Sequence, residues 1–257
     1  MNVLVTGGTG ALGRDVVNGL RASGHRVRVL SRRPGTGADW VQGDLGTGKG
    51  IEAALYDMEV VVHAASAAKQ PWRLRAVDVD GTRRLLEAAK RARVKHFVYI
   101  SIVGMEDVAY AYYRSKLAAE AIVTEDIVPW SMLRATQFHT LMETFLSVFA
   151  RPPRIAAVPF AWQFQPVDTR EVAARLVEIT TGAPAGRLPD FGGPEIRTFE
   201  SLANSWLKAR RMNKRLVNLR LPTKFSRQVA DGQLLSPEHK DGKTTFEQYL
   251  VRRYGKW

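Results

Sequence analysis

A glycine-rich turn at residues 7–13 constrains the fold of this chain more than any other feature. The apolar run Asn2–Thr6 shows no helical periodicity and predicts a strand, and Arg14–Ala22 predicts a helix. In this order of strand, turn and helix, the backbone can approach a pyrophosphate, and the positive end of the helix dipole points at it. We therefore predict a dinucleotide clamp with the phosphates over Thr9–Leu12. Its residues are Gly7, Thr9, Gly10, Ala11, Leu12 and Gly13.

The residues after the second predicted strand, Arg26–Leu30, indicate which dinucleotide is bound. NAD-selective sites place an acidic residue about twenty positions after the turn, where it binds the ribose 2′-hydroxyl. This chain instead has Ser31, Arg32 and Arg33 there. Guanidinium groups match the forked geometry of a phosphate, whereas a carboxylate would repel it. We therefore predict NADP (NADPH) as the cofactor, with these three residues at its 2′-phosphate.

Apolar runs alternate with helical stretches through the first half of the chain, as in parallel strands joined by crossover helices. Further strands are expected at 40–42, 59–64, 96–100 and 130–133, and helices at about 50–56, 72–92 and 112–125. This order predicts an α/β fold with a doubly wound, Rossmann-like parallel sheet. Later helices are expected from Asp168 and Thr169, over Thr198–Arg210, and after a capping box of Thr244 and Glu247.

We expect residues 1–257 to form a single NAD(P)-binding domain. Residues 1–135 would be the cofactor core, and 136–257 a small, irregular C-terminal part that binds the substrate. The C-terminal elements would pack around the carboxyl ends of the strands, where open α/β sheets bind their ligands.

The composition excludes several classes of function. The chain has no cysteine, which excludes disulfides, thiolate catalysis and cysteine-ligated zinc. Its five histidines lack the spacing of metal ligands, so no metal is expected. No apolar run reaches the length of a membrane span, and the N-terminus enters a strand at once. We therefore expect a soluble, cytoplasmic protein with no membrane partner.

The formal charge of +13 raises the alternative of nucleic-acid binding, because the basic residues between Lys208 and Arg227 meet no acid. Charge alone indicates a general attraction to polyanions. No helix-turn-helix, zinc-finger or aromatic RNA-binding pattern accompanies it. We favour a solvated basic face and expect no nucleic-acid partner; the alternative predicts steeply salt-sensitive association with DNA.

A tyrosine and a lysine four residues apart follow the fifth predicted strand, which ends near Ser101. Tyr112 and Lys116 would lie on one face at the start of a helix. Such a pair suits carbonyl reduction, because the ammonium group stabilises phenolate character while the phenol passes a proton to oxygen as hydride reaches carbon. We predict both as catalytic residues.

Together these segments resemble the short-chain dehydrogenase/reductase superfamily, and most of all its atypical NmrA-like branch. The resemblance is based on residues 6–13, 43–45, 63–66, 79–82 and 112–116, and it extends to 164–173 and 191–194. It implies that Asp44 and Leu45 border the adenine. It also implies that Ala64, Ala65 and Ser66 line the cofactor groove, and that Lys116 holds the cofactor ribose.

Two positions depart from the family pattern. The catalytic hydroxyl of the extended enzymes usually lies two residues beyond the serine that ends the fifth strand, and that position is Val103 here. Ser101 either replaces it or only satisfies backbone groups at the strand end. The amide-bearing position of the family's proton relay is Asp78. Since the branch includes proteins that bind the cofactor without turning it over, a redox-sensing or regulatory protein stays open as an alternative.

We therefore expect an NADPH-dependent oxidoreductase that reduces a small, largely apolar carbonyl or unsaturated substrate, with Tyr112 as the proton donor. A cofactor-retaining isomerase or dehydratase would use much the same residues. Either a monomer or a homodimer is expected. Substrate recognition is expected from Met105, Gln137, Phe138, His139 and Trp162, with Phe164 as a further lid residue.

Overall fold

The main sheet of the protein has seven parallel strands, six from the first 135 residues and one from residues 186–187. We describe residues 1–37 and 39–256 of a computed structural model. The strand order of the sheet is β3-β2-β1-β4-β5-β6-β9, the doubly wound arrangement expected from the sequence. The strands are β1 (Asn2–Thr6), β2 (Arg26–Ser31), β3 (Trp40–Gln42), β4 (Val60–His63), β5 (His96–Ile102), β6 (Trp130–Ala135) and β9 (Gly186–Arg187). The six expected strands are present, and β9 is an addition to them.

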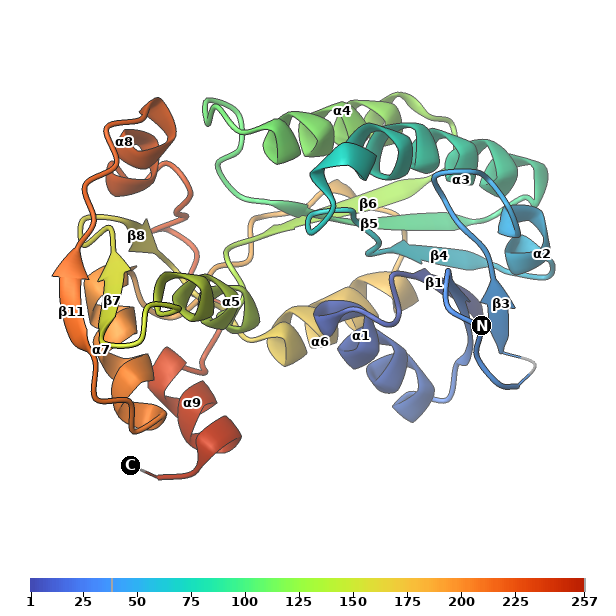
Figure 1. Cartoon of the computed structure of the whole chain (residues 1–257). Helices are drawn as coiled ribbons and strands as arrows, with labels where there is room; N and C mark the ends of the chain where they lie inside the picture. The colour runs from blue at the N-terminus through green and yellow to red at the C-terminus, as the bar shows by residue number, and fades with distance from the viewer. Residues whose placement is uncertain (38, 257) are drawn as a thin grey trace. The chain divides into compact units, whose positions relative to one another are not determined.

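Helices cover both faces of this sheet (Figure 1). They are α1 (Ala11–Ala22) and α6 (Thr169–Thr181) on one face, and α2 (Ile51–Leu55), α3 (Asp80–Arg91) and α4 (Ala111–Glu125) on the other. Strand residues such as Val3, Leu4 and Val5 are fully buried because both sides of the sheet are covered. An apolar core that includes Leu4, Leu85 and Val123 joins the sheet to the second set of helices.

The helix expected at 72–92 is interrupted. A 3₁₀ turn at Pro71–Arg73 and a π turn at Arg75–Val79 precede α3. Single π turns are frequent at functional sites. The π turn contains Asp78, which is 2% exposed.

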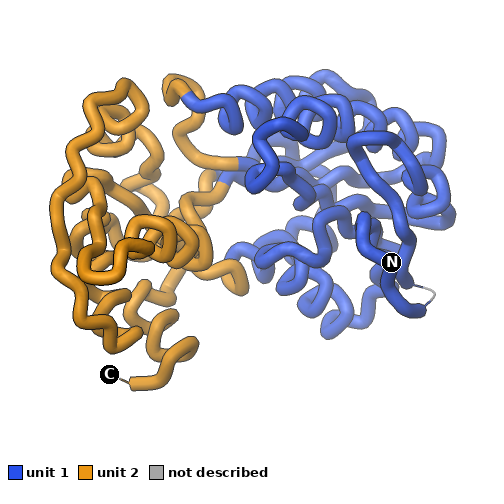
Figure 2. The backbone as a smooth tube through the Cα atoms, in the orientation of Figure 1, with its two compact units in different colours: residues 1–101, 110–134, 172–189 blue, residues 102–109, 135–171, 190–257 orange. Residues whose placement is uncertain are grey.

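The chain divides into two compact units (Figure 2). Unit 1 comprises residues 1–101, 110–134 and 172–189, and unit 2 comprises 102–109, 135–171 and 190–257. The expected cofactor core, 1–135, therefore lacks one part of unit 1. Residues 172–189 contribute most of α6 and the edge strand β9, which pairs with β6 through Ser131 and Met132.

Unit 2 is built from short elements around an aromatic core. Its helices are α5 (His139–Phe149), α7 (Phe199–Ala209), α8 (Lys224–Ala230) and α9 (Phe246–Tyr254), and its strands are β7 (Ile155–Val158), β8 (Gln163–Phe164), β10 (Arg197–Thr198) and β11 (Arg215–Asn218). The strands form two pairs, a parallel β7–β11 and an antiparallel β8–β10. The rings of Phe149, Trp162, Phe164 and Phe199 pack against one another.

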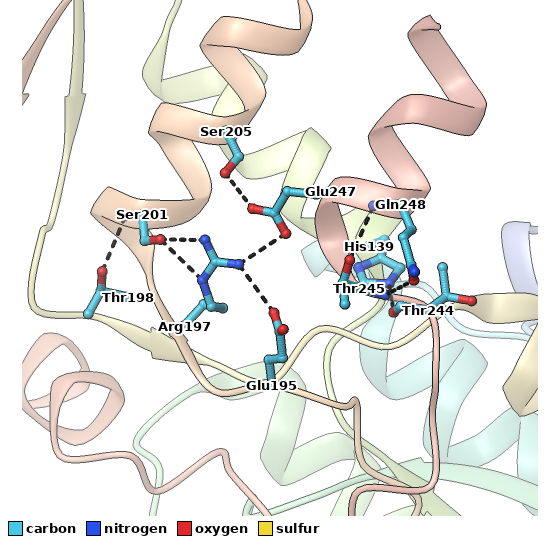
Figure 3. Close-up of polar contacts among 10 residues, drawn as sticks. All are labelled: His139, Glu195, Arg197, Thr198, Ser201, Ser205, Thr244, Thr245, Glu247 and Gln248. Carbon is cyan, nitrogen blue, oxygen red and sulfur yellow. Dashed lines mark hydrogen bonds and ion pairs between the residues drawn. The ribbon is translucent and has the colours of Figure 1, made fainter. Parts of the chain in front are cut away.

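The capping box of the last helix lies one residue later than the sequence predicts. Thr245 and Gln248 cap α9, and Glu247 instead accepts hydrogen bonds from Arg197 and Ser205 (Figure 3). The prediction of Thr244 with Glu247 was therefore wrong. Asp168 does cap α6 as expected, since its Oδ1 accepts the Arg170 N–H at 2.9 Å.

Candidate active site

The glycine turn has the geometry that close backbone approach requires. Gly7 has a φ of +72°, and a Cβ atom there would lie 2.5 Å from the Ala64 carbonyl oxygen. A Cβ on Gly13 would lie 2.1 Å from the Gly7 oxygen. Gly10 precedes α1 without any side-chain cap, and Thr9, Gly10 and Ala11 are exposed. The uncapped helix N-terminus thus faces solvent, as an anion-binding site needs.

Leu12 is different, because its side chain is buried in unit 1 with 6% exposure. Any contact of Leu12 with a bound dinucleotide therefore comes from its backbone.

Two exposed arginines follow β2. The Arg32 guanidinium donates to the Gln70 side-chain oxygen at 3.0 Å, while the Arg33 N–H donates to the buried Ser31 hydroxyl at 3.2 Å. Both guanidinium groups are therefore accessible to an anionic ligand.

Asp44 is held by a residue that the sequence did not identify. Its Oδ2 accepts the Arg73 guanidinium at 2.6 Å and its Oδ1 accepts the Gly46 N–H at 2.9 Å. Burial alone would raise the pKa of Asp44, but the hydrogen bonds from Arg73 and Gly46 and the charge of Arg73 outweigh it and lower this pKa. Asp44 is thus a fixed anion beside buried Leu45, the two residues expected at the adenine.

The segment after β4 meets the start of α4. Ala64 and Ala65 are half-buried, and the exposed Ser66 donates a hydrogen bond to the Tyr112 hydroxyl at 3.3 Å. Burial raises the pKa of Tyr112 to about 12, despite the opposing hydrogen bond from Ser66. The Tyr112 phenol therefore keeps its proton near neutral pH.

Lys116 is buried one turn further along α4. Its ammonium group donates to the Tyr99 hydroxyl at 2.6 Å and to the Ile100 carbonyl at 2.8 Å. Burial lowers the pKa of Lys116 to about 8, although the charges of Asp78 and Glu120 oppose this. Tyr99, which the sequence did not single out, is therefore a direct partner of the expected catalytic lysine.

Two buried polar atoms near this pair lack hydrogen-bond partners among the described residues. They are the Ser101 Oγ and the Asp78 Oδ1. The other carboxylate oxygen of Asp78 accepts the Ala67 N–H at 2.9 Å. Leaving such an atom unpaired costs about 1–3 kcal/mol.

A histidine that the sequence treated only as part of a motif ties three elements of unit 1 together. His63 lies at the end of β4 with its Nδ1 2.6 Å from the Thr6 hydroxyl and its Nε2 3.0 Å from the Thr82 hydroxyl. Burial lowers the pKa of His63 to about 3, so the ring is neutral. The signal in the sequence was a histidine that directly follows the three valines of a buried strand.

The expected substrate residues all lie in unit 2, where most make internal contacts. Met105 is fully buried, and the Gln137 side chain donates to the Leu234 carbonyl and accepts the Gln165 N–H. The Trp162 ring NH donates to the Ser226 hydroxyl at 2.8 Å. These side chains therefore hold unit 2 together.

Phe138 and His139 lie at the start of α5. Phe138 is half-buried and forms a bridge to Val167. The His139 Nε2 lies 3.1 Å from the Thr244 carbonyl oxygen (Figure 3), and its ring stacks on Tyr249. Burial lowers the pKa of His139, and the Thr244 carbonyl opposes this.

Other kinds of site receive no support within residues 1–37 and 39–256. No group of three or more histidine and acidic side chains there could hold a metal ion. None of the helices in this part of the chain is both long and apolar enough to cross a bilayer. Most basic side chains between Lys208 and Arg227 are exposed.

Comparisons with known proteins agree with this geometry. A family model described as NAD(P)H-binding matches residues 7–147. The (4-alkanoyl-5-oxo-2,5-dihydrofuran-3-yl)methyl phosphate reductase of Streptomyces griseus subsp. griseus is 34% identical over 209 residues, which cover 76% of this chain and 69% of that protein.

Two further relatives carry different names. A ceramide reductase of Caulobacter vibrioides is 29% identical over 188 residues, covering 68% of this chain and 59% of that protein. The photosystem II assembly factor Ycf39 of Trieres chinensis is 31% identical over 148 residues, covering 54% of this chain and 46% of that protein. This chain thus spans less than two thirds of either relative.

Solved structures share the fold. A short-chain dehydrogenase/reductase superfamily protein from Agrobacterium tumefaciens with bound NAD has a TM-score of 0.73 at 22% identity, with 99% of this chain and 96% of that chain covered. An epimerase from Methanothermobacter thermautotrophicus has a TM-score of 0.81 at 15% identity, with 98% and 90% covered. The chain belongs to the family described as NAD(P)H-binding, whose model matches more than half of it, and it has the fold of these dinucleotide-binding proteins.

Proposed function

We propose that this protein reduces a small, largely apolar carbonyl or unsaturated compound with NADPH, and that Tyr112 donates the proton. The observation that carries the proposal is the placement of Tyr112 and Lys116 one turn apart on α4, in the same unit as the glycine turn, with the Tyr112 hydroxyl 3.3 Å from the Ser66 hydroxyl. A phenol that keeps its proton near neutral pH is suited to donate it to a developing alkoxide.

The residues present fit a nicotinamide dinucleotide. The glycine turn leaves room that a Cβ would fill, and the uncapped start of α1 supplies N–H groups and a dipole for the pyrophosphate. Bound NADPH supplies a hydride. Gly7, Gly10 and Gly13 hold the diphosphate, Asp44 and Leu45 border the adenine, and Tyr112 gives its proton to the substrate oxygen. Lys116 places a positive charge behind the site, where it stabilises the phenolate left on Tyr112.

The preference for NADPH is based on Arg32 and Arg33, both exposed after β2. Losing one charge-assisted contact to the 2′-phosphate costs about 1.5–3 kcal/mol. We therefore expect Arg32→Ala to weaken NADPH binding by about tenfold or more and to leave NADH binding nearly unchanged. Isothermal titration with both cofactors measures this, and Arg83→Ala, an exposed arginine on α3, is the matched control. Equal losses for NADPH and NADH would contradict this assignment.

The substrate class is inferred from the surroundings of Tyr112. The ring of Tyr110, which is 44% exposed, lies edge-on to Tyr112 and Tyr113 at 6.4 and 5.2 Å between centroids. An exposed aromatic ring beside the proton donor favours an apolar substrate. Two relatives are named as reductases, one of ceramide and one of a (4-alkanoyl-5-oxo-2,5-dihydrofuran-3-yl)methyl phosphate. The expected roles of Met105, Gln137, Phe138, His139 and Trp162 toward this substrate stay predictions.

The test of the function is Tyr112→Phe. With phenanthrenequinone as the probe, we expect NADPH oxidation to fall by about 10²–10⁴-fold, the usual contribution of a positioned general acid, while NADPH affinity changes little. Tyr56→Phe, at a residue 77% exposed that caps the C-terminal end of α2, is the control. Wild-type turnover in Tyr112→Phe would refute the role of Tyr112.

A binding protein with little turnover is the second candidate. The Ycf39 relatives are named as assembly factors, and Val103 supplies no hydroxyl at the family's usual position. NADPH deuterated at its transferable position separates the candidates. A reductase yields a deuterated product, whereas a sensor or a cofactor-retaining isomerase yields none.

A further inference from the structure

The ammonium group of Lys116 is held by two oxygen atoms of strand β5. It donates to the Tyr99 hydroxyl at 2.6 Å and to the Ile100 carbonyl oxygen at 2.8 Å, and it lies 4.0 Å from the centroid of the Tyr99 ring. Because an ammonium group has three donors, these two bonds leave one N–H of Lys116 without an acceptor among residues 1–37 and 39–256. Tyr99 thus limits both where the charge lies and how many donors remain free.

The strand and the core fix the position of Tyr99. Phe97 and Tyr99 lie two positions apart on β5, and both enter the apolar core under α2, α3 and α4. Tyr99 is 1% exposed, and its ring lies 5.4 Å from the ring of His63 between centroids. Since side chains in a close-packed core have little freedom, the hydroxyl of a buried ring stays at one point. The Tyr99 oxygen is therefore a fixed acceptor for Lys116.

The Tyr99 phenol is also a neutral acceptor. Burial raises the pKa of Tyr99 well above its usual value, and the charges of Asp78 and Glu120 act in the same direction. Tyr99 therefore keeps its own proton. A carboxylate in this place would pair with Lys116 and cancel its charge, whereas a neutral oxygen leaves the positive charge available to the site.

The environment of Lys116 otherwise disfavours its charged form. Burial lowers the pKa of Lys116 to about 8, although the charges of Asp78 and Glu120 oppose this. The titratable groups that face this cluster come from four elements: Asp78 from the π turn, His63 from β4, Tyr99 from β5, and Tyr112 and Glu120 from α4, with Arg134 of β6 bonded to Glu120. A hydrogen bond from a charged donor is about twice as strong as a neutral one. Each oxygen that accepts from Lys116 therefore favours the ammonium form.

We propose that Tyr99 is a positioning residue for Lys116, which keeps the ammonium group charged and leaves one N–H for the cofactor or for Tyr112. The inference rests on the proposed function, in which the charge of Lys116 stabilises the phenolate left on Tyr112. Tyr99 acts only through Lys116, because its ring is buried and its hydroxyl is bonded to the ammonium group. No covalent bond is made or broken at Tyr99, and no proton passes through it.

The first test needs neither substrate nor cofactor. We label the lysine Cε atoms with carbon-13, assign Lys116 by its loss in Lys116→Met, and titrate it by NMR. The wild-type signal should move with a midpoint at the pKa of about 8. Tyr99→Phe keeps the ring and removes the acceptor, so it should lower the pKa of Lys116 by about one, a tenfold change in the dissociation constant. A Lys116 titration that Tyr99→Phe does not move would overturn the proposal.

The matched control is Tyr249→Phe in unit 2. Tyr249 is 6% exposed, and its hydroxyl donates to the Glu143 carboxylate. This variant likewise loses a buried phenol that is bonded to a charged group, and it should leave the Lys116 titration unchanged.

A measurement on the wild type does not depend on the folding of Tyr99→Phe. The Cζ signal of Tyr99, assigned through contacts of its ring protons with Lys116, should shift with the same midpoint as Lys116. The reason is that the bond between them weakens when the ammonium group loses its proton. A Tyr99 signal that stays constant through this midpoint would contradict the proposal.

The second test asks whether turnover depends on this bond. With phenanthrenequinone and NADPH, the single-turnover rate of the wild type should fall as pH rises through the Lys116 pKa of about 8. Tyr99→Phe should move this fall down by about one pH unit, so that its rate is about fivefold lower at about pH 8 and nearly equal at about pH 6. Tyr249→Phe should keep the wild-type profile. A purely structural defect would lower the rate at both pH values, so equal losses at both would contradict the role of Tyr99.

The outcomes separate the two proposals. If Tyr112→Phe is inactive while Tyr99→Phe keeps the wild-type Lys116 titration and pH profile, the role of Tyr99 is wrong and the proton donor stands. If Tyr112→Phe is fully active, the proposed function is wrong, and the NMR titration alone decides whether Tyr99 keeps Lys116 charged.

Discussion

Acid should destabilise this protein through His63, and the size of the effect can be worked out. The folded ring bonds to the hydroxyls of Thr6 and Thr82, and its pKa is about 3. A histidine in the unfolded chain has a pKa of about 6.5. Because the folded pKa is depressed, the unfolded chain binds a proton that the folded chain excludes. Stability is therefore lost as pH falls from 6.5 toward 3.

At about pH 5 the expected loss is about 2 kcal/mol, from about 1.4 kcal/mol for each pH unit below 6.5. A folded pKa of about 4 in place of about 3 would change this figure by less than about 0.1 kcal/mol, because His63 stays unprotonated at pH 5 in either case. The expected loss of stability therefore depends on the burial of a neutral ring, and hardly on how far the pKa of His63 falls below 6.5.

The comparison with His63→Gln isolates this histidine. Glutamine offers a donor and an acceptor to the two threonines but does not titrate. Urea unfolding followed by circular dichroism should show that the free energy of unfolding falls between pH 7 and pH 5 by about 2 kcal/mol more in wild type than in His63→Gln. In thermal unfolding the same difference corresponds to about 4–8 °C in Tm. Equal losses in the two proteins would refute the assignment of a buried neutral His63.

Two further substitutions test the turn and the core of unit 1. Gly13→Ala would place a Cβ 2.1 Å from the Gly7 carbonyl oxygen, so NADPH affinity should fall by about tenfold or more in a fluorescence titration. Gly24→Ala strains the backbone, because Gly24 has a φ of +79°, but a Cβ there meets nothing within 4 Å, so this affinity should stay unchanged. Glu120 pairs with buried Arg134 at 2.5 Å, and Glu120→Gln should cost about 3–5 kcal/mol in urea unfolding because it removes the carboxylate charge that faces a buried guanidinium group. The same change at the exposed Glu178 should cost about 0.5 kcal/mol or less; similar costs at the two sites would contradict this reasoning.

The parallel sheet could be predicted because its strands are buried on both faces. Such strands are continuous apolar runs, and the turn at residues 7–13 marks where the first of them ends. The placement of Tyr112 and Lys116 on one face of a helix could also be predicted from local sequence, because residues four positions apart lie on the same helix face.

Contacts between distant positions could not be predicted in this way. Ser66 meets Tyr112 across 46 positions, and Arg73 reaches Asp44 across 29. Hydrophobic periodicity cannot show a π turn either, because the apolar positions around Asp78 also fit a continuous helix. The capping box was misplaced because Thr244 with Glu247 and Thr245 with Gln248 satisfy the same pattern.

The sheet of unit 1 is completed by a segment that arrives late in the chain. Strand β9 pairs with β6, and α6 packs on α1, where a Cβ on Gly19 would lie 3.0 Å from Val177. During translation, the N-terminal 135 residues therefore emerge from the ribosome with one sheet edge and one helix surface uncovered. They stay so until residues 172–189 have been synthesised.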